Sequence, residues 1–62
     1  MDEISQAVAL ILATILAGEK CHLYCNNDFT AYYVERGLQE SGVNFLMIWC
    51  DKRKCWLIYK NN

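Results

Sequence analysis

Apolar residues recur along the first part of the chain with the spacing of an α-helix. Between residues 3 and 17 they fall at i, i+4, i+7 and i+8, which places one broad apolar stripe along a helix. Asp2 is positioned to cap the start of this helix, and Gly18 to end it. The opposite side is apolar as well, with Leu10 among alanines. Because a helix that is apolar on all sides is normally buried on all sides, this pattern predicts that the chain has a partner.

A short strand and a second helix are predicted next. Residues 21–25 suit a strand in which Cys21 and Leu23 point to one face and His22 to the other. Residues 28–41 suit a helix, since the preceding asparagines favour capping and the apolar positions share one face.

The end of the chain predicts a β-hairpin. Its strands are residues 43–50 and 55–60, and a polar four-residue loop joins them. Pairing Cys50 with Cys55 sets the register. A sheet with one face in water normally alternates apolar and polar residues, but this hairpin is apolar on both faces. We therefore expect one face to pack under the helices and the other to contact another molecule.

The two faces of the hairpin differ in side-chain size. The larger side chains share the face that consists of Phe45, Met47, Trp49, Trp56 and Ile58. The opposite face consists of Leu46, Ile48, Cys50, Cys55, Leu57 and Tyr59. Because aromatic residues and methionine are enriched at the centres of interfaces, we expect the first face to form a homodimer interface. The second face is then expected to lie beneath a helix.

The element order α-β-α-β-β predicts a single small α+β domain over residues 1–62. We expect a three-stranded mixed sheet packed with two helices. The crossover through the second helix predicts that the first two strands run parallel, and the hairpin makes the third antiparallel to the second. Strand orders 1-2-3 and 1-3-2 both remain open.

Composition and charge narrow the class of protein. The chain is 55% apolar with a net charge of −1, which excludes intrinsic disorder and nucleic-acid binding by bulk charge. Acidic residues precede the N-terminal apolar run, and the run is too short to span a membrane. We therefore expect no membrane association and a cytoplasmic protein with reduced cysteines.

The four cysteines and the single histidine do not predict a catalytic or metal site. Cys21 and Cys25 on one strand lie about 13 Å apart, too far to share a metal ion. Neighbouring strand residues face opposite ways, so His22 does not serve Cys21 as a base. We expect no metal, no cofactor and no enzymatic activity, and interpret the cysteines as small apolar side chains. A disulfide between Cys50 and Cys55 is sterically possible.

Two further groups of residues are candidates for binding. Four side chains share the exposed side of the second predicted helix: Phe29, Tyr32, Tyr33 and Arg36. Tyrosine and arginine are enriched at binding hot spots, so we expect these four to bind another protein. Three basic residues occupy the hairpin loop, Lys52, Arg53 and Lys54, close in sequence to aromatic residues. They support the alternative of a small nucleic-acid-binding or regulatory domain.

The expected function is therefore a small non-enzymatic protein-interaction module. We expect a homodimer that binds and modulates, or inhibits, another protein that the sequence does not identify. Small proline-free proteins without motifs are frequent among phage and mobile-element genes, which favours an accessory protein of viral or phage type. Nucleic acid is the less favoured partner.

Overall fold

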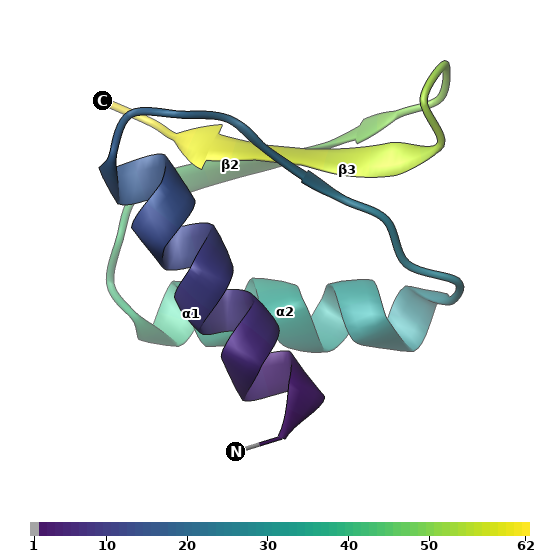
Figure 1. The fold of residues 1–62 in the computed structure, drawn as a ribbon, viewed down its shortest axis with the longest axis horizontal. Coiled ribbons are helices and arrows are strands. Elements are labelled where there is room, and N and C mark those ends of the chain that lie inside the picture. Colours follow the sequence, from purple (N-terminus) through teal and green to yellow (C-terminus); the bar gives the residue numbers. More distant parts are fainter. Residues whose placement is uncertain (1) are drawn as a thin grey trace.

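The computed structural model describes residues 2–62, which form two helices and three strands (Figure 1). In chain order the elements are α1 (Glu3–Leu16), β1 (Cys21–Leu23), α2 (Asp28–Glu40), β2 (Phe45–Cys50) and β3 (Cys55–Lys60). The predicted α+β class and element order are confirmed, and each predicted boundary lies within two residues of the observed one. In Figure 1, α2 lies below the β2–β3 hairpin and α1 crosses obliquely in front of α2.

Side-chain caps start both helices. The Oδ1 atom of Asp2 accepts a hydrogen bond from the Ser5 amide at 2.7 Å, and its Oδ2 atom accepts one from the Ser5 hydroxyl at 3.0 Å. At α2, the Oδ1 atom of Asn27 accepts from the Thr30 amide at 2.9 Å. α1 is followed by Gly18 at φ +86°, a left-handed conformation that favours glycine. These local contacts explain why the helices begin and end where the sequence predicts.

The Asp2 cap gives a testable pH dependence. The hydrogen bonds from Ser5 lower the pKa of the Asp2 carboxyl below its ordinary value of 3.8. The charged Asp2 cap therefore stabilises α1 at pH values above the ordinary pKa of 3.8. This stabilisation is lost as the pH falls through the lowered pKa of the folded protein. We expect Asp2→Ala to lower the melting temperature at pH 7, measured by circular dichroism. Asp2→Asn, which still caps, should keep most of the stability at pH 7 and lose less of it on acidification than the natural chain.

The sheet differs from the expected mixed sheet in how its strands pair. The strand order is β1-β3-β2, and both neighbouring pairs are antiparallel. β1 and β2 do run in the same direction, as the crossover predicts, but β3 lies between them. The expected mixed sheet is therefore wrong, and the order is the second of the two that the sequence left open, because the crossover rule fixes the directions of the two strands and does not require them to be neighbours.

The hairpin register is the predicted one. Cys50 lies opposite Cys55, Trp49 opposite Trp56, Ile48 opposite Leu57 and Met47 opposite Ile58. In the loop, the Lys54 amide donates to the Cys50 carbonyl at 2.8 Å, and Lys54 has φ +57°. The loop thus closes the hairpin at the predicted pair, and the alternation of side chains between the two faces follows from it.

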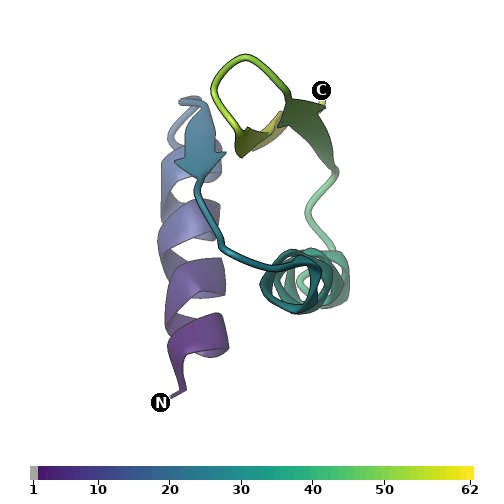
Figure 2. The same cartoon turned by 90° about the vertical axis from the view of Figure 1, so that its right-hand side faces the viewer.

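The face that packs against the helices is the reverse of the predicted one. The fully buried core consists of Ile11, Ile15, Val34, Leu38 and Ile58. Phe45, Met47 and Trp56 are partly buried against this core, so the face expected to form the interface faces α1 and α2. Leu46 and Ile48, expected to be covered, are 36% and 47% exposed. Figure 2 shows α2 beneath the hairpin and α1 beside β1, which leaves the far face of the sheet without a helix.

Candidate protein-interaction surfaces

The sheet face that no helix covers is one candidate surface, here called the open face. By register it carries the exposed His22 of β1 and the hairpin side chains of Leu46, Ile48, Cys50, Cys55, Leu57 and Tyr59. Leu46 and Ile48 are exposed, and Leu57 and Tyr59 are half-buried. The Lys20 ammonium lies 5.6 Å from the centre of the Tyr59 ring, a cation–π contact. This face has the apolar character of an interface.

The four side chains predicted on the second helix do share one exposed side of α2. Phe29, Tyr32 and Tyr33 are 74%, 50% and 52% exposed. An Arg36 guanidinium nitrogen donates to the Tyr32 hydroxyl at 3.0 Å, and the Tyr32 and Tyr33 rings meet edge to face with centres 5.3 Å apart. These contacts hold the side chains of Tyr32, Tyr33 and Arg36 in defined positions at the surface, which reduces the entropy that binding has to offset. We call this group the aromatic patch.

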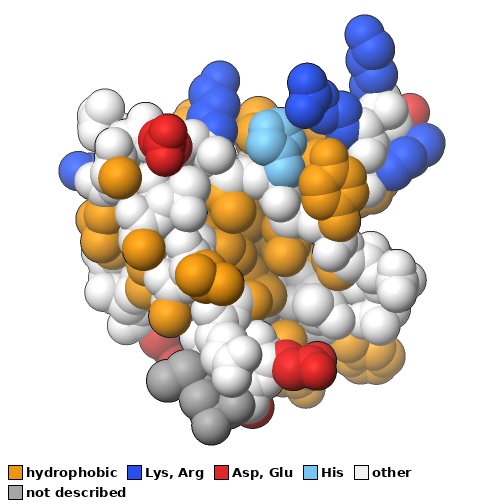
Figure 3. Space-filling model, viewed as in Figure 1, with side chains coloured by type: hydrophobic (Ala, Val, Ile, Leu, Met, Phe, Trp, Pro, Cys, Tyr) orange, Lys and Arg blue, Asp and Glu red, His pale blue; other side chains and the backbone are white. Residues whose placement is uncertain are grey.

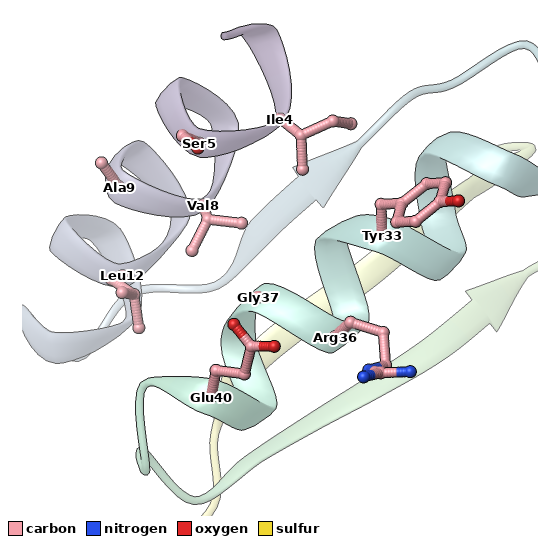
Figure 4. Close-up of a pocket in the computed structure, with 9 residues that line it drawn as sticks. All are labelled: Ile4, Ser5, Val8, Ala9, Leu12, Tyr33, Arg36, Gly37 and Glu40. Carbon is pink, nitrogen blue, oxygen red and sulfur yellow. The ribbon is translucent and has the colours of Figure 1, made fainter. Parts of the chain in front are cut away.

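A groove between the two helices adjoins the aromatic patch (Figure 4). Its volume is about 470 Å³. The floor is aliphatic and comes from α1, with Ile4, Val8 and Leu12, while Tyr33, Arg36 and Glu40 of α2 form its other wall. The groove is apolar inside and charged at its rim, as binding sites for apolar side chains usually are.

The outer side of α1 is also apolar. Leu10 is 70% and Leu16 is 56% exposed, and the neighbouring alanines are exposed too. Hydrophobic side chains are spread over this part of the molecule in Figure 3, where α1 faces the viewer. Leu16 follows Leu12 at i+4 and so belongs by spacing to the predicted apolar stripe, but it is the last residue of the helix and stays exposed.

The basic loop lies at the end of the hairpin, where Lys52, Arg53 and Lys54 are all exposed. Lys54 pairs with Asp51 at 2.8 Å, so part of the loop's positive charge is offset locally. The Trp49 and Trp56 rings meet edge to face at 5.4 Å, on the helix side of the hairpin, whereas Tyr59 is on the open face. The two tryptophans next to the loop thus share one face, and Tyr59, which pairs with Leu46 at the other end of the hairpin, does not extend a stacking surface beside the loop.

The cysteines are free thiols, and one of them contacts the histidine. The Nδ1 atom of His22 lies 3.7 Å from the Cys55 sulfur, a contact that sequence reasoning did not anticipate because the strand order was open. Cys55 is fully buried, so its sulfur is closed to a substrate. Burial raises the pKa of the Cys21 thiol, which keeps it in the unreactive protonated form.

One further surface was missed at the sequence level, namely the outer edge of β2. The strand order makes β2 an edge strand, six residues long and without a charged side chain. An order with β2 in the centre would have paired both of its sides. The uncharged composition of residues 45–50 was the available signal, because exposed edges usually carry charge or proline.

Comparisons with known proteins identify no relative. No protein-family model, no curated protein and no solved structure matches the chain. Within residues 2–62, neither helix has the length and apolarity needed to cross a bilayer. The same residues bring together no group of three or more histidine, cysteine or acidic side chains suited to a metal ion.

Proposed function

We propose that this chain is a small non-enzymatic protein-interaction module that forms a homodimer and binds a second protein. The observation that carries the proposal is the number of large apolar side chains left at the surface of so small a protein. Among residues 2–62, nine are exposed: Leu10, Leu16, Tyr24, Phe29, Tyr32, Tyr33, Leu46, Ile48 and Trp49. Burying one such side chain contributes about 1.5–3 kcal/mol, so each group of them makes association at its own surface favourable.

The exposed side chains fall on different sides of the molecule, which supports two partners. Leu46 and Ile48 are on the sheet, whereas the aromatic patch is on α2. We assign self-association to the sheet and recognition of the second protein to the aromatic patch, whose tyrosines and arginine are hot-spot residue types. Binding of this kind modulates or inhibits the bound protein by covering part of its surface.

The proposal also includes a cellular compartment, a type of protein and an alternative function. Four free thiols suit a reducing cytoplasm, and the small size suits an accessory protein of phage type. The alternative, nucleic-acid binding through Lys52, Arg53 and Lys54, is less well supported because Asp51 offsets Lys54 and a net charge of −1 gives no bulk attraction to phosphates.

The proposal is tested by measuring two properties of the natural chain and its variants: the molecular mass in solution and the capture of a host protein. Light scattering should give twice the 7.2 kDa chain mass at high concentration. Immobilised protein should capture a host protein that the Phe29→Ser and Tyr33→Ser variants lose. Truncating a hot-spot residue costs about 2 kcal/mol or more, which corresponds to about 30-fold weaker binding.

The matched control is Leu10→Ser, which removes an equally exposed side chain from α1 and should leave capture unchanged. All three variants should melt within a few degrees of the natural chain, because exposed substitutions have small effects on stability. Equal capture by all four proteins would exclude the aromatic patch as the binding surface.

A further inference from the structure

The outer edge of β2 presents backbone groups that have no partner in the sheet. In an antiparallel pair, alternate residues direct both their N–H and C=O groups toward the neighbouring strand. Cys50 accepts from Lys54 and Asn44 accepts from Asn61, so the even-numbered residues of β2 face β3. The odd-numbered residues, Phe45, Met47 and Trp49, therefore direct their amides and carbonyls away from the sheet.

This edge lacks the features that usually prevent strand addition. β2 contains no proline and no charged side chain, and none of residues 45–50 has a positive φ. The other edge of the sheet is β1, which is only three residues long. By the same alternation, only His22 of β1 directs its amide and carbonyl outward. Strand addition at β2 is therefore favoured over addition at β1.

We propose that β2 pairs antiparallel with β2 of a second copy of this chain, about a two-fold axis at Met47. The proposal rests on the self-association proposed above and specifies its geometry. In this register Met47 lies opposite Met47 of the second copy, and Phe45 lies opposite Trp49 of the second copy. Every outward amide and carbonyl of Phe45, Met47 and Trp49 then has a partner, and the contact is closed and isologous.

The side chains on the open face fit the same register. It places Leu46 opposite Ile48 of the second copy, twice by symmetry. These are non-hydrogen-bonded pairs, the kind in which antiparallel side chains approach most closely. Leu46 and Ile48 are the two exposed apolar side chains of the open face, at 36% and 47%. In this register, the apolar side chains that a single chain leaves exposed to water contact each other.

The helix side of the edge also has space for a side chain of a second copy. An open groove of about 500 Å³ follows the edge and is lined by Glu35, Gln39, Phe45 and Met47 among others. In the proposed register, Trp49 of the second copy lies opposite Phe45 and enters this groove. Trp49 is 44% exposed in the single chain, so both of its copies gain apolar contact.

Self-complementarity is what selects a second copy over another extended peptide. A foreign strand could satisfy the outward backbone groups, but the pairing of Leu46 with Ile48 and of Phe45 with Trp49 arises from the sequence itself. The net charge of −1 per chain adds little repulsion between copies.

The decisive variants each carry a methyl group on one backbone nitrogen. Such a chain can be prepared by joining two synthetic peptides at Cys50. A methyl group on the Met47 nitrogen removes an outward donor and leaves the bonds between β2 and β3 intact. The matched control carries the methyl group on the His22 nitrogen, the outward donor of the other edge. Light scattering should show a monomer for the Met47 form and a dimer for both the His22 form and the natural chain.

Amide hydrogen exchange on the unmodified protein gives an independent readout. The Met47 and Trp49 amides should exchange about tenfold or more slowly at a concentration where the dimer dominates than at one where the monomer does. The His22 amide should exchange equally at both. A dimer in which the Met47 amide exchanges equally at both concentrations, or a Met47-methylated chain that stays dimeric, would overturn edge pairing while leaving self-association intact. A chain that stays monomeric throughout would overturn self-association as well.

Discussion

Replacing Ile58 with alanine is expected to lower the free energy of unfolding by about 2–5 kcal/mol, the usual cost of truncating a buried isoleucine. Ile58 is fully buried and contacts the core that α1 and α2 form. A domain of this size has only a few kcal/mol of stability to lose. The variant should therefore be largely unfolded at room temperature, as measured by urea denaturation followed by circular dichroism.

The matched control is the same substitution at Ile48, on the neighbouring strand and the opposite face. Ile48 is 47% exposed, so Ile48→Ala should cost less than about 1 kcal/mol in solution dilute enough to dissociate the proposed dimer. If Ile48→Ala were the more damaging change under those conditions, the open face would be the one that the helices cover. At high concentration the Ile48 variant should also dimerise less, since the proposed register places Ile48 at the contact.

Replacing Gly37 with alanine is expected to destabilise the protein by about 1–3 kcal/mol, although alanine is the better helix former. A Cβ atom at position 37 would lie 2.7 Å from Cγ2 of Val8, closer than side chains approach in folded proteins. Gly37 lines the interhelical groove on α2 and faces Val8 of α1 (Figure 4). The valine side chain is short and branched, so the clash has to move the helices apart.

A second substitution tests that explanation directly. In a Val8→Ala background the contacting methyl groups are absent, and Gly37→Ala should then cost little or should stabilise the chain through its helix propensity. Thermal melting of the four proteins in the cycle gives the coupling between the two positions. A Gly37→Ala cost that is the same in both backgrounds would show that Val8 is not the obstacle.

Much of the fold was predictable because it depends on local chemistry. The helix boundaries follow from Asp2, Asn27 and Gly18, which act on their own turns. The hairpin register follows from the loop, because a four-residue connection leaves Cys50 opposite Cys55. The aromatic patch was predictable for the same reason, since helical periodicity alone places Phe29 and Tyr33 on one side.

Which of the two hairpin faces packs against the helices depends on tertiary packing, and the apolar pattern of the sequence does not predict that packing. Both faces are apolar, so neither is marked as the inner one. Small cysteines were expected beneath a helix, but the helices cross obliquely and leave space that larger side chains reach. Met47 and Trp56, for example, extend to the start of α2, where they line a cleft with Ala31 and Tyr32. Side-chain size therefore indicated the opposite face from the one observed.

The unequal lengths of the two sheet edges determine how far an assembly of this chain can grow. The proposed pairing through β2 would use the long edge of each copy and leave only the three-residue β1 strands at the two ends of the enlarged sheet. Each end then presents the amide and carbonyl of a single residue, His22, which is too little to template a further strand. Growth should stop at two copies, so an apolar strand that is otherwise well suited to fibril formation is kept out of fibrils by the shortness of the opposite edge.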